Sequence, residues 1–315
     1  MTSHSPSASS STATPGVCIA ATASGSGKTT IATGLIAALT SRMKVAPFKV
    51  GPDYIDPGYH SIASGCVGRN LDSVLCGNDL IGPLYHYGSQ HADIAVVEGV
   101  MGLFDGRISD GAGSTADIAA TLGIPILLIV DARGMSQSVG AVVRGFATAR
   151  SDVRIAGVIL NKVGSDRHAA VCREAVEAEG IPVVGSIPRQ HDIVVPSRHL
   201  GLVTAIEHGE AALKAIQSME KLIEQTCDVD RISALADCSY TGLMWDPTTV
   251  VDKVGQPTIA MAGGPAFTFG YAEHRELLEA AGATVVVFDP LQDALPTCDG
   301  LIIPGGFPEE HVVEL

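Results

Sequence analysis

The stretch CIAATASGSGKTTIATGL, residues 18 to 35, joins a short apolar run to a glycine-rich turn, a lysine and two threonines. Glycines let backbone amides approach an anion closely, and a helix that begins there adds its positive end. Lys28 would reach the β- and γ-phosphates of a nucleotide, and the hydroxyl of Thr29 would bind magnesium. The predicted phosphate-binding residues are Gly25, Ser26, Gly27, Lys28, Thr29 and Thr30.

This loop departs from the usual sequence pattern of phosphate-binding loops, because Thr22 stands where the first glycine is expected. A plain Gly/Ser turn between a strand and a helix is the alternative interpretation. The apolar run before it, the helical pattern after it and the Lys-Thr pair favour phosphate binding. Ala23 stands where partitioning ATPases carry an additional lysine, which argues against an ATPase switch that binds protein partners.

Acidic residues follow the next two expected strands. FKVGPDYIDPGYH contains Asp53 and Asp56, and VVEGVMGLFDG contains Glu98 and Asp105. Because parallel strands end at the same edge of a sheet, these carboxylates should lie beside the phosphate loop. Carboxylates next to phosphates repel them unless magnesium lies between the two. We therefore predict Mg²⁺ held by Thr29, Asp53 and Glu98, with Pro/Asp/Gly turns as the alternative for the acidic strings.

Several of these strings carry a family resemblance. KVGPDYIDPGYH, RNLDS, EGVMGLFDG, STADIA, GVILN and SRHLGLV resemble the cobyrinic/hydrogenobyrinic acid a,c-diamide synthases of cobalamin biosynthesis. Further along, AGGPAFTFGYAEHRELLEAAGATVVVFDPL and IIPGGFPEEH resemble the start of that family's glutamine amidotransferase domain. The resemblance implies a cytoplasmic ligase that uses ATP and glutamine, or ammonia, to amidate the a and c carboxylates of a corrinoid through acyl phosphates.

The resemblance also implies roles for individual residues. It places Asp53, Asp56 and Asp105 around the metal or the attacked carboxylate. Tyr54 and Ile55 would lie against the macrocycle, or would simply anchor a turn. Asn161, at the end of GVILN, would contact adenine, with a strand-end turn as its alternative. The predicted catalytic set is Lys28, Asp53, Asp56, Glu98 and Asp105.

Two anions that meet in one site need local positive charge, and the whole chain has a formal net charge of −14. Four basic residues are candidates for a cationic rim around the phosphates. A solvated surface cation is the alternative for each of them. They are Lys49, Arg69, Arg107 and Lys162.

The string PGGFPEE, with Gly305, Gly306 and Phe307, resembles the oxyanion loop of the glutamine amidotransferase domain. Backbone amides of such a turn stabilise a tetrahedral intermediate. The nucleophilic cysteine of that family lies well after this loop, whereas Cys298 precedes it. We therefore expect no glutaminase nucleophile in this chain and an incomplete second domain.

The elements that must position these residues follow an α/β pattern. Continuously apolar strand candidates, from VCIAA at residue 17 to PVVGSIP at residue 182, alternate with segments of helical spacing. This alternation predicts a doubly wound parallel sheet, which the resemblance makes similar to dethiobiotin synthetase. We expect a disordered tail at 1–16, a ligase domain at 17–245 closed by a helix at 207–226, and a linker at 246–256. A flavodoxin-like glutamine amidotransferase domain would begin at 257–315.

Composition narrows the class of protein. An acidic chain of 315 residues, 46% hydrophobic, repels nucleic acid and anionic membranes, and it has no apolar run of membrane-spanning length. Seven cysteines without a CxxC pair indicate reduced thiols. A nickel-tetrapyrrole diamide synthase, an ATPase switch and an inactive remnant are the alternatives, and a homodimer is left open.

Overall fold

Seven parallel strands form the main sheet of the computed structural model, which describes residues 12–189, 197–198, 201–202 and 205–315. The strand order is β3-β2-β4-β1-β5-β6-β7, and each neighbouring pair is parallel. The strands are β1 (Gly16–Ala21), β2 (Val45–Val50), β3 (Arg69–Leu71), β4 (Ile94–Glu98), β5 (Ile126–Asp131), β6 (Ile155–Val163) and β7 (Val183–Pro188).

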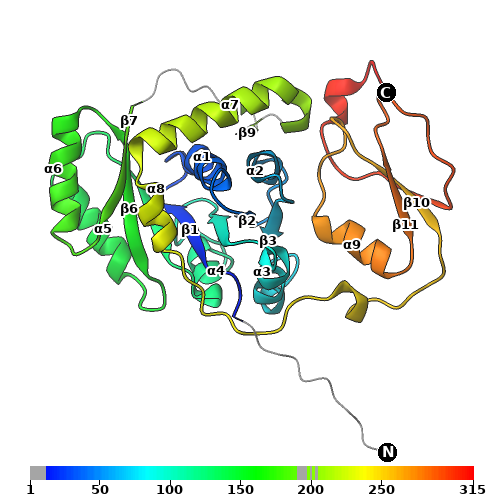
Figure 1. Cartoon of the computed structure of the whole chain (residues 1–315), viewed down its shortest axis with the longest axis horizontal. Helices are drawn as coiled ribbons and strands as arrows, with labels where there is room; N and C mark the ends of the chain where they lie inside the picture. The colour runs from blue at the N-terminus through cyan, green and yellow to red at the C-terminus, as the bar shows by residue number, and fades with distance from the viewer. Residues whose placement is uncertain (1–11, 190–196, 199–200, 203–204) are drawn as a thin grey trace, which may run out of the picture.

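Helices cover both faces of this sheet, so the predicted doubly wound fold is confirmed (Figure 1). Successive residues of β1 alternate between two cores, with Cys18 in one and Ile19 in the other, which explains the unbroken apolar run. One face carries α1 (Lys28–Thr40), α2 (Asp56–Ser64), α7 (Ala205–Thr226) and α8 (Val229–Ala234). The other carries α3 (Ile81–Ser89), α4 (Thr115–Leu122), α5 (Ser138–Thr148) and α6 (Asp166–Glu177).

A second, smaller parallel sheet has the order β11-β10-β12. It comprises β10 (Thr258–Ala262), β11 (Thr284–Phe288) and β12 (Gly300–Ile302), with α9 (Ala272–Ala280) between the first two strands. A flavodoxin-like sheet begins with this strand order. Figure 1 shows this part beside the β3 edge of the main sheet, with α9 turned toward α3. We call the part from residue 257 onward the second part.

The remaining elements are short. β8 (Ser197–Arg198) pairs with β9 (Gly201–Leu202) in an antiparallel ladder. Three 3₁₀ turns are η1 (Asn78–Leu80), η2 (Pro247–Thr249) and η3 (Pro308–His311). Helix α7 is kinked at Gly209, where φ is 39° and ψ is −105°. Of the string SRHLGLV, residues 199, 200 and 203 lie outside the described residues.

The expected tail at 1–16 is too long at its C-terminal end. Gly16 belongs to β1, and Ala13 is buried with its N–H donating to the carbonyl of Tyr240 at 3.1 Å. The hydroxyl of Tyr85 donates to the carbonyl of Thr14 at 2.8 Å. Contacts with Tyr85 and Tyr240, together with strand pairing at Gly16, therefore fix residues 13–16, whereas residues 1–11 lie outside the described part.

Two elements near the site were not predicted. Strand β3 has only three residues, too few for a period to appear. Helix α2 begins at Asp56, inside the Pro- and Gly-rich string interpreted as a loop, with Pro57 in its first turn. Proline is well tolerated there because its missing N–H has no partner within the helix in any case.

Candidate active site

The predicted phosphate loop connects β1 to α1. Gly25 and Gly27 have φ values of 73° and 94°, in the left-handed region that favours glycine. A Cβ on Gly27 would lie 2.6 Å from Nδ2 of Asn161, so a side chain has no room there. Helix α1 begins at Lys28 directly after the loop, so its positive end faces the same place.

Two residues at the end of β6 form hydrogen bonds to this loop. Asn161 donates from Nδ2 to the carbonyl of Ser26 at 2.8 Å and accepts the N–H of Lys162 at 2.8 Å. The ammonium of Lys162 donates to the carbonyl of Gly25 at 3.0 Å and pairs with Asp131 at 3.0 Å. In the structure Asn161 therefore supports the phosphate loop, a contact that the sequence analysis did not foresee.

A cavity of about 420 Å³ adjoins this support. Its walls combine apolar side chains with a few polar and charged groups, as is usual for ligand cavities. Thr30 lines it together with Gly27, Ile31, Arg133, Asn161, Lys162, Ile187, Pro188, Arg189 and Leu222. Asn161 therefore faces the space in which a base would be expected, and its role toward adenine stays a prediction.

Three predicted site residues meet at the carboxyl ends of β2 and β4. Thr29 donates from Oγ1 to Oε1 of Glu98 at 2.8 Å, and its Oγ1 lies 3.3 Å from Oδ2 of Asp56. Glu98 is 1% exposed and Asp56 is 7% exposed. Two buried carboxylates and a hydroxyl thus converge beside the phosphate loop, brought together by three separate elements.

Lys49 is the counter-charge of this cluster. Its ammonium lies 3.4 Å from Oδ2 of Asp56, 3.6 Å from Oδ2 of Asp53 and 4.0 Å from Oε1 of Glu98. It also donates to the carbonyl of Gly99 at 3.2 Å, and the residue is 3% exposed. Lys49 was predicted as a member of a cationic rim, but the structure buries it among the acids.

The two buried carboxyl groups titrate in opposite directions. Burial raises the pKa of Asp56 well above its usual value, and the charges of Glu98 and Asp53 add to this. Burial also acts to raise the pKa of Glu98, but Lys49, His60 and Thr29 outweigh it and bring that pKa down to about 2. Glu98 is therefore the permanently ionised member, and Asp56 is the member whose charge the site tolerates least.

His60 is a site neighbour that the sequence analysis missed. It lies on α2 and is fully buried, and its Nε2 is 2.8 Å from Oε2 of Glu98. Glu98 thus has one oxygen toward Thr29 and the other toward His60. The signal was present in the sequence, since His60 closes the string GPDYIDPGYH, but a helical position four residues after Asp56 was not considered.

Asp53 and Asp105 organise turns. Oδ1 of Asp53 accepts the N–H groups of Ile55 at 2.9 Å and Asp56 at 3.0 Å, which fixes the entry to α2. Oδ2 of Asp105 accepts the N–H of Gly102 at 3.0 Å. Asp105 is exposed, and its charge acts on Lys28, whose ammonium donates to the carbonyl of Met101.

The oxygen donors at this cluster fit magnesium. Mg²⁺ in nucleotide sites usually takes one or two carboxylates, with phosphates and waters filling its other positions. Thr29 and Glu98 meet that requirement, and Asp53 keeps Oδ2 directed toward Lys49. In the described ranges no group of three or more His, Cys, Asp or Glu side chains is arranged to hold a metal by itself. The site therefore suits a metal that arrives with phosphate.

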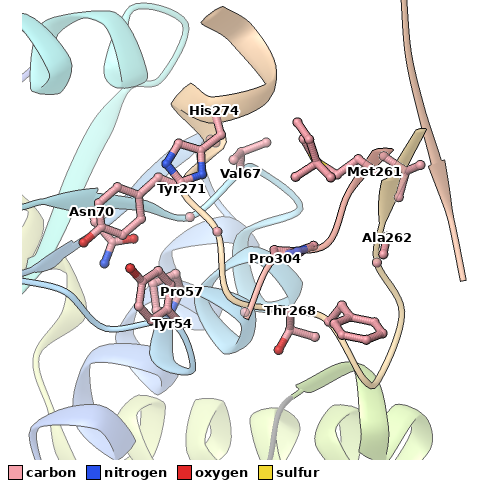
Figure 2. A pocket seen from close by; sticks show the side chains of 18 of the residues that line it. Tyr54, Pro57, Val67, Asn70, Met261, Ala262, Thr268, Tyr271, His274 and Pro304 are labelled. Carbon is pink, nitrogen blue, oxygen red and sulfur yellow. The ribbon is translucent and has the colours of Figure 1, made fainter. Parts of the chain in front are cut away.

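Tyr54 and Ile55 line a larger cavity of about 760 Å³. One wall comes from residues 53–70, and the other comes from residues 251–304. Figure 2 shows Tyr54, Asn70 and Tyr271 on one side and Met261, Ala262 and Pro304 on the other. The lining is mostly apolar side chains and backbone, as expected for a hydrophobic ligand. Both parts of the chain thus build this cavity.

The remaining rim candidates differ in their surroundings. Arg69 is buried and pairs with Glu273 and Glu276 of α9, so it is not on a phosphate rim. Arg107 is exposed and pairs with Asp110. Lys162 alone of these three contacts the phosphate loop.

The turn predicted as an oxyanion loop packs against the segment before α9. The carbonyl of Gly305 accepts the N–H of Phe269 at 2.9 Å, and the N–H of Phe307 donates to the carbonyl of Ala266 at 3.1 Å. A Cβ on Gly306 would lie 2.0 Å from that same carbonyl, so glycine is required by packing. The Phe307 amide is therefore engaged within the fold in this arrangement.

Two general features accompany the site. None of the helices within the described residues is long and apolar enough to cross a membrane. All seven cysteines are free, and burial raises the pKa of the Cys18 thiol to about 12.

Comparisons with known proteins agree with this site. Residues 17–203 match the family described as "CobQ/CobB/MinD/ParA nucleotide binding domain", so the chain belongs to this class of nucleotide-binding proteins. Within the class, it is 55% identical to a hydrogenobyrinate a,c-diamide synthase of Mycobacterium tuberculosis, over 95% of this chain and 67% of that protein. It is 49% identical to the Streptomyces coelicolor protein of the same name, over 98% of this chain and 71% of that protein.

A cobyrinate a,c-diamide synthase of Picrophilus torridus is 40% identical over 93% of this chain and 67% of that protein. The chain belongs to the family of hydrogenobyrinate and cobyrinate a,c-diamide synthases. The family predicted from the strings is confirmed.

Proposed function

We propose that this chain carries the ATP-dependent amidation of the a and c carboxylates of hydrogenobyrinate or cobyrinate, as the names of its relatives suggest. One observation carries the proposal. The segment from Asp53 to Asp56, which we call the acid loop, has Asp56 beside Thr29 of the phosphate loop and Tyr54 in the wall of the large cavity. A carboxylate of a ligand in that cavity would be presented to a nucleotide on the phosphate loop.

The chemistry needs a leaving group, because a carboxylate oxygen does not leave when ammonia attacks. In the proposed reaction, a substrate carboxylate oxygen attacks the γ-phosphorus of ATP, the bond to the bridging oxygen breaks, and ADP leaves. Ammonia then attacks the acyl carbon and releases phosphate, and the nitrogen loses a proton to give the amide. Two such rounds give the diamide.

The side chains of this site would mainly position groups and balance charge, as is usual in phosphoryl transfer. Loop amides and Lys28 hold the phosphates, while Thr29 and Glu98 would hold magnesium, which offsets charge on the transferred group. Lys49 sits among the carboxylates, where it neutralises repulsion against an incoming anion. We also propose that glutamine is the source of ammonia. Only the second part of the chain supports this proposal.

The mass of the product tests this function. The protein is incubated with ATP, Mg²⁺ and ammonium, together with hydrogenobyrinate, cobyrinate or nickel-sirohydrochlorin. We expect a diamide from one or both corrinoids and ADP in step with amide formed. A diamide from the nickel compound alone would reassign the substrate. ATP hydrolysis without any amide would favour the ATPase switch.

A further inference from the structure

The string RNLDS, residues 69–73, has no part in the chemistry described above. In the structure it forms β3 and the turn that follows, at the edge of the main sheet. Figure 1 shows this edge on the side of the main sheet that faces the second part. Its side chains have two kinds of partner. Asn70 contacts the acid loop, whereas Arg69 and Asp72 contact the second part.

On the inner side, Asn70 supports the backbone of the acid loop. Its Nδ2 donates to the carbonyl of Gly51 at 2.8 Å and to the carbonyl of Asp53 at 2.7 Å. Asn70 is 4% exposed, so these bonds are shielded from water. The position of β3 therefore sets the position of the main chain at Asp53.

On the outer side, the second part holds β3 by charged and polar contacts. The guanidinium of Arg69 pairs with Glu273 at 2.7 Å and with Glu276 at 2.5 Å. The hydroxyl of Tyr271 donates to Oδ2 of Asp72 at 2.8 Å, and Asp72 is fully buried. Fork-shaped pairing of arginine with two carboxylates fixes orientation as well as distance.

The second part also touches the acid loop directly. The ring of Tyr54 stacks on Phe269, with centroids 5.2 Å apart, and on Tyr271, with centroids 5.3 Å apart. Tyr54 lies between Asp53 and Asp56 in sequence, so the two rings restrain the loop at its centre. Such stacked aromatic pairs stabilise an arrangement beyond the effect of the area that they bury.

The acid loop needs such a restraint. Asp53, Asp56 and Glu98 surround a single lysine, and the side chains of Asp56 and Glu98 are buried, with 7% and 1% of each residue exposed. Repulsion and the cost of burying charge both favour movement of the loop away from Glu98. Contacts outside the cluster must oppose that movement.

We propose that the second part positions the acid loop for the ligase reaction, with Phe269 and Tyr271 as positioning residues. This inference rests on the proposed function and adds a role for the second part that is independent of supplying ammonia. It requires that disturbing the aromatic contact slows amidation even when free ammonium is the nitrogen donor. Misplacement of reacting groups by about 1 Å costs on the order of a hundredfold in rate.

The test compares Phe269→Leu, which keeps apolar volume without a ring, with Phe269→Tyr, which keeps the ring. Amidation is measured with ammonium, at saturating ATP and macrocycle. We expect kcat to fall ten- to a hundredfold in Phe269→Leu and to stay within threefold in Phe269→Tyr. Amide hydrogen exchange of the peptide containing Ile55 and Asp56 should speed up at least fivefold in Phe269→Leu only.

Val285→Ala is the matched control, because Val285 is buried in β11 and has no role in holding Tyr54. Its melting temperature reports the cost of loosening the second part in general. An unchanged kcat in Phe269→Leu, or an equal loss in Val285→Ala, would overturn the inference. If the wild-type protein makes no amide, the proposed function fails, whereas the hydrogen-exchange comparison still decides whether the second part holds the loop.

Discussion

At the scale of single residues, Lys49 explains how three carboxylates share one site. Its ammonium lies within 4.0 Å of an oxygen of Asp53, Asp56 and Glu98. Burial acts to lower the pKa of Lys49, but the surrounding acids raise it, so the lysine stays charged. The site thus has a net negative charge before any nucleotide arrives, which is why a magnesium ion would bind together with the phosphates.

Lys28→Ala should lower ATP turnover about a hundred- to a thousandfold with the fold intact, by analogy with other groups that stabilise charge in a transition state. Lys28 is half-buried, and its ammonium donates to the carbonyl of Met101, so it has no role in the hydrophobic core. Phosphate release measures the rate. Lys44→Ala, at an exposed lysine, should leave it unchanged. Near-normal turnover in folded Lys28→Ala protein would refute the phosphate-loop assignment.

Asp56→Asn and Glu98→Gln should shift the stability of the metal-free protein in opposite directions. The raised pKa of Asp56 means that its charge destabilises the fold above the folded pKa, so Asp56→Asn should stabilise most at high pH and least near pH 4. The pKa of Glu98, about 2, means that its stabilising effect is present above about pH 4.5 and is lost as the pH falls toward 2. Glu98→Gln should therefore cost on the order of 3 kcal/mol at pH 7.

Thermal melting with a chelator present, between pH 4 and pH 8, measures both variants against the wild type. Both substitutions should abolish or strongly reduce amidation, because each removes a carboxyl group next to Thr29. Destabilisation by Asp56→Asn at pH 8 would contradict the assigned order of the two carboxyl groups.

At the scale of elements, the phosphate loop requires glycine at position 27 for two reasons, its positive φ and the lack of room for a side chain. Gly27→Ala places a methyl group 2.6 Å from Nδ2 of Asn161 and forces alanine to a φ of 94°. Gly25→Ala is the matched control, since its φ is 73° but nothing lies within 4 Å of the new Cβ. We expect Gly27→Ala to weaken binding of a fluorescent ATP analogue at least tenfold more than Gly25→Ala. Equal effects would mean that strain alone matters and that the support by Asn161 does not.

The sequence was most informative where one local pattern determines one element. Buried parallel strands are continuously apolar, so β1, β2 and β4 to β7 were predictable, as were the loop glycines and the acids at strand ends. Strand β3 was missed because three residues show no period. It is held by pairing with β2 and by the side chains of Asn70 and Arg69, which bond to distant segments. His60 stands in the string GPDYIDPGYH, but its partner Glu98 is 38 residues away, so the string alone does not show which group His60 contacts. Contacts of this kind have no local signal.

At the scale of the whole molecule, the second part completes the large cavity and holds the edge of the main sheet. The sequence analysis assigned the macrocycle contacts to the first domain alone, whereas the cavity beside Tyr54 has residues 251–304 as its second wall. A ligand in this cavity would contact both parts at once. Binding of the macrocycle and docking of the second part should therefore stabilise each other.

This chain should take its amide nitrogen from free ammonia. A glutaminase of the cysteine type needs a thiolate, and burial raises the pKa of five thiols of this chain, namely Cys18, Cys76, Cys172, Cys227 and Cys238. Of the other two cysteines, Cys66 is exposed shortly after α2, outside the second part. Cys298 packs against the small hydrophobic cluster of the second sheet and precedes the glycine turn at Gly305. The 315-residue chain should therefore form amide with concentrated ammonium at a pH where free NH₃ is appreciable, and none with glutamine.

Mass spectrometry of the corrinoid product distinguishes the two donors in parallel reactions at equal ATP and Mg²⁺. Cys298→Ser is the decisive comparison, because it removes the thiol nearest in sequence to the glycine turn and keeps its size. We expect it to leave the ammonium reaction unchanged. Glutamine-dependent product from the wild type that disappears in Cys298→Ser would show that Cys298 is a nucleophile, and the assignment of the second part would then have to place its glutaminase before Gly305.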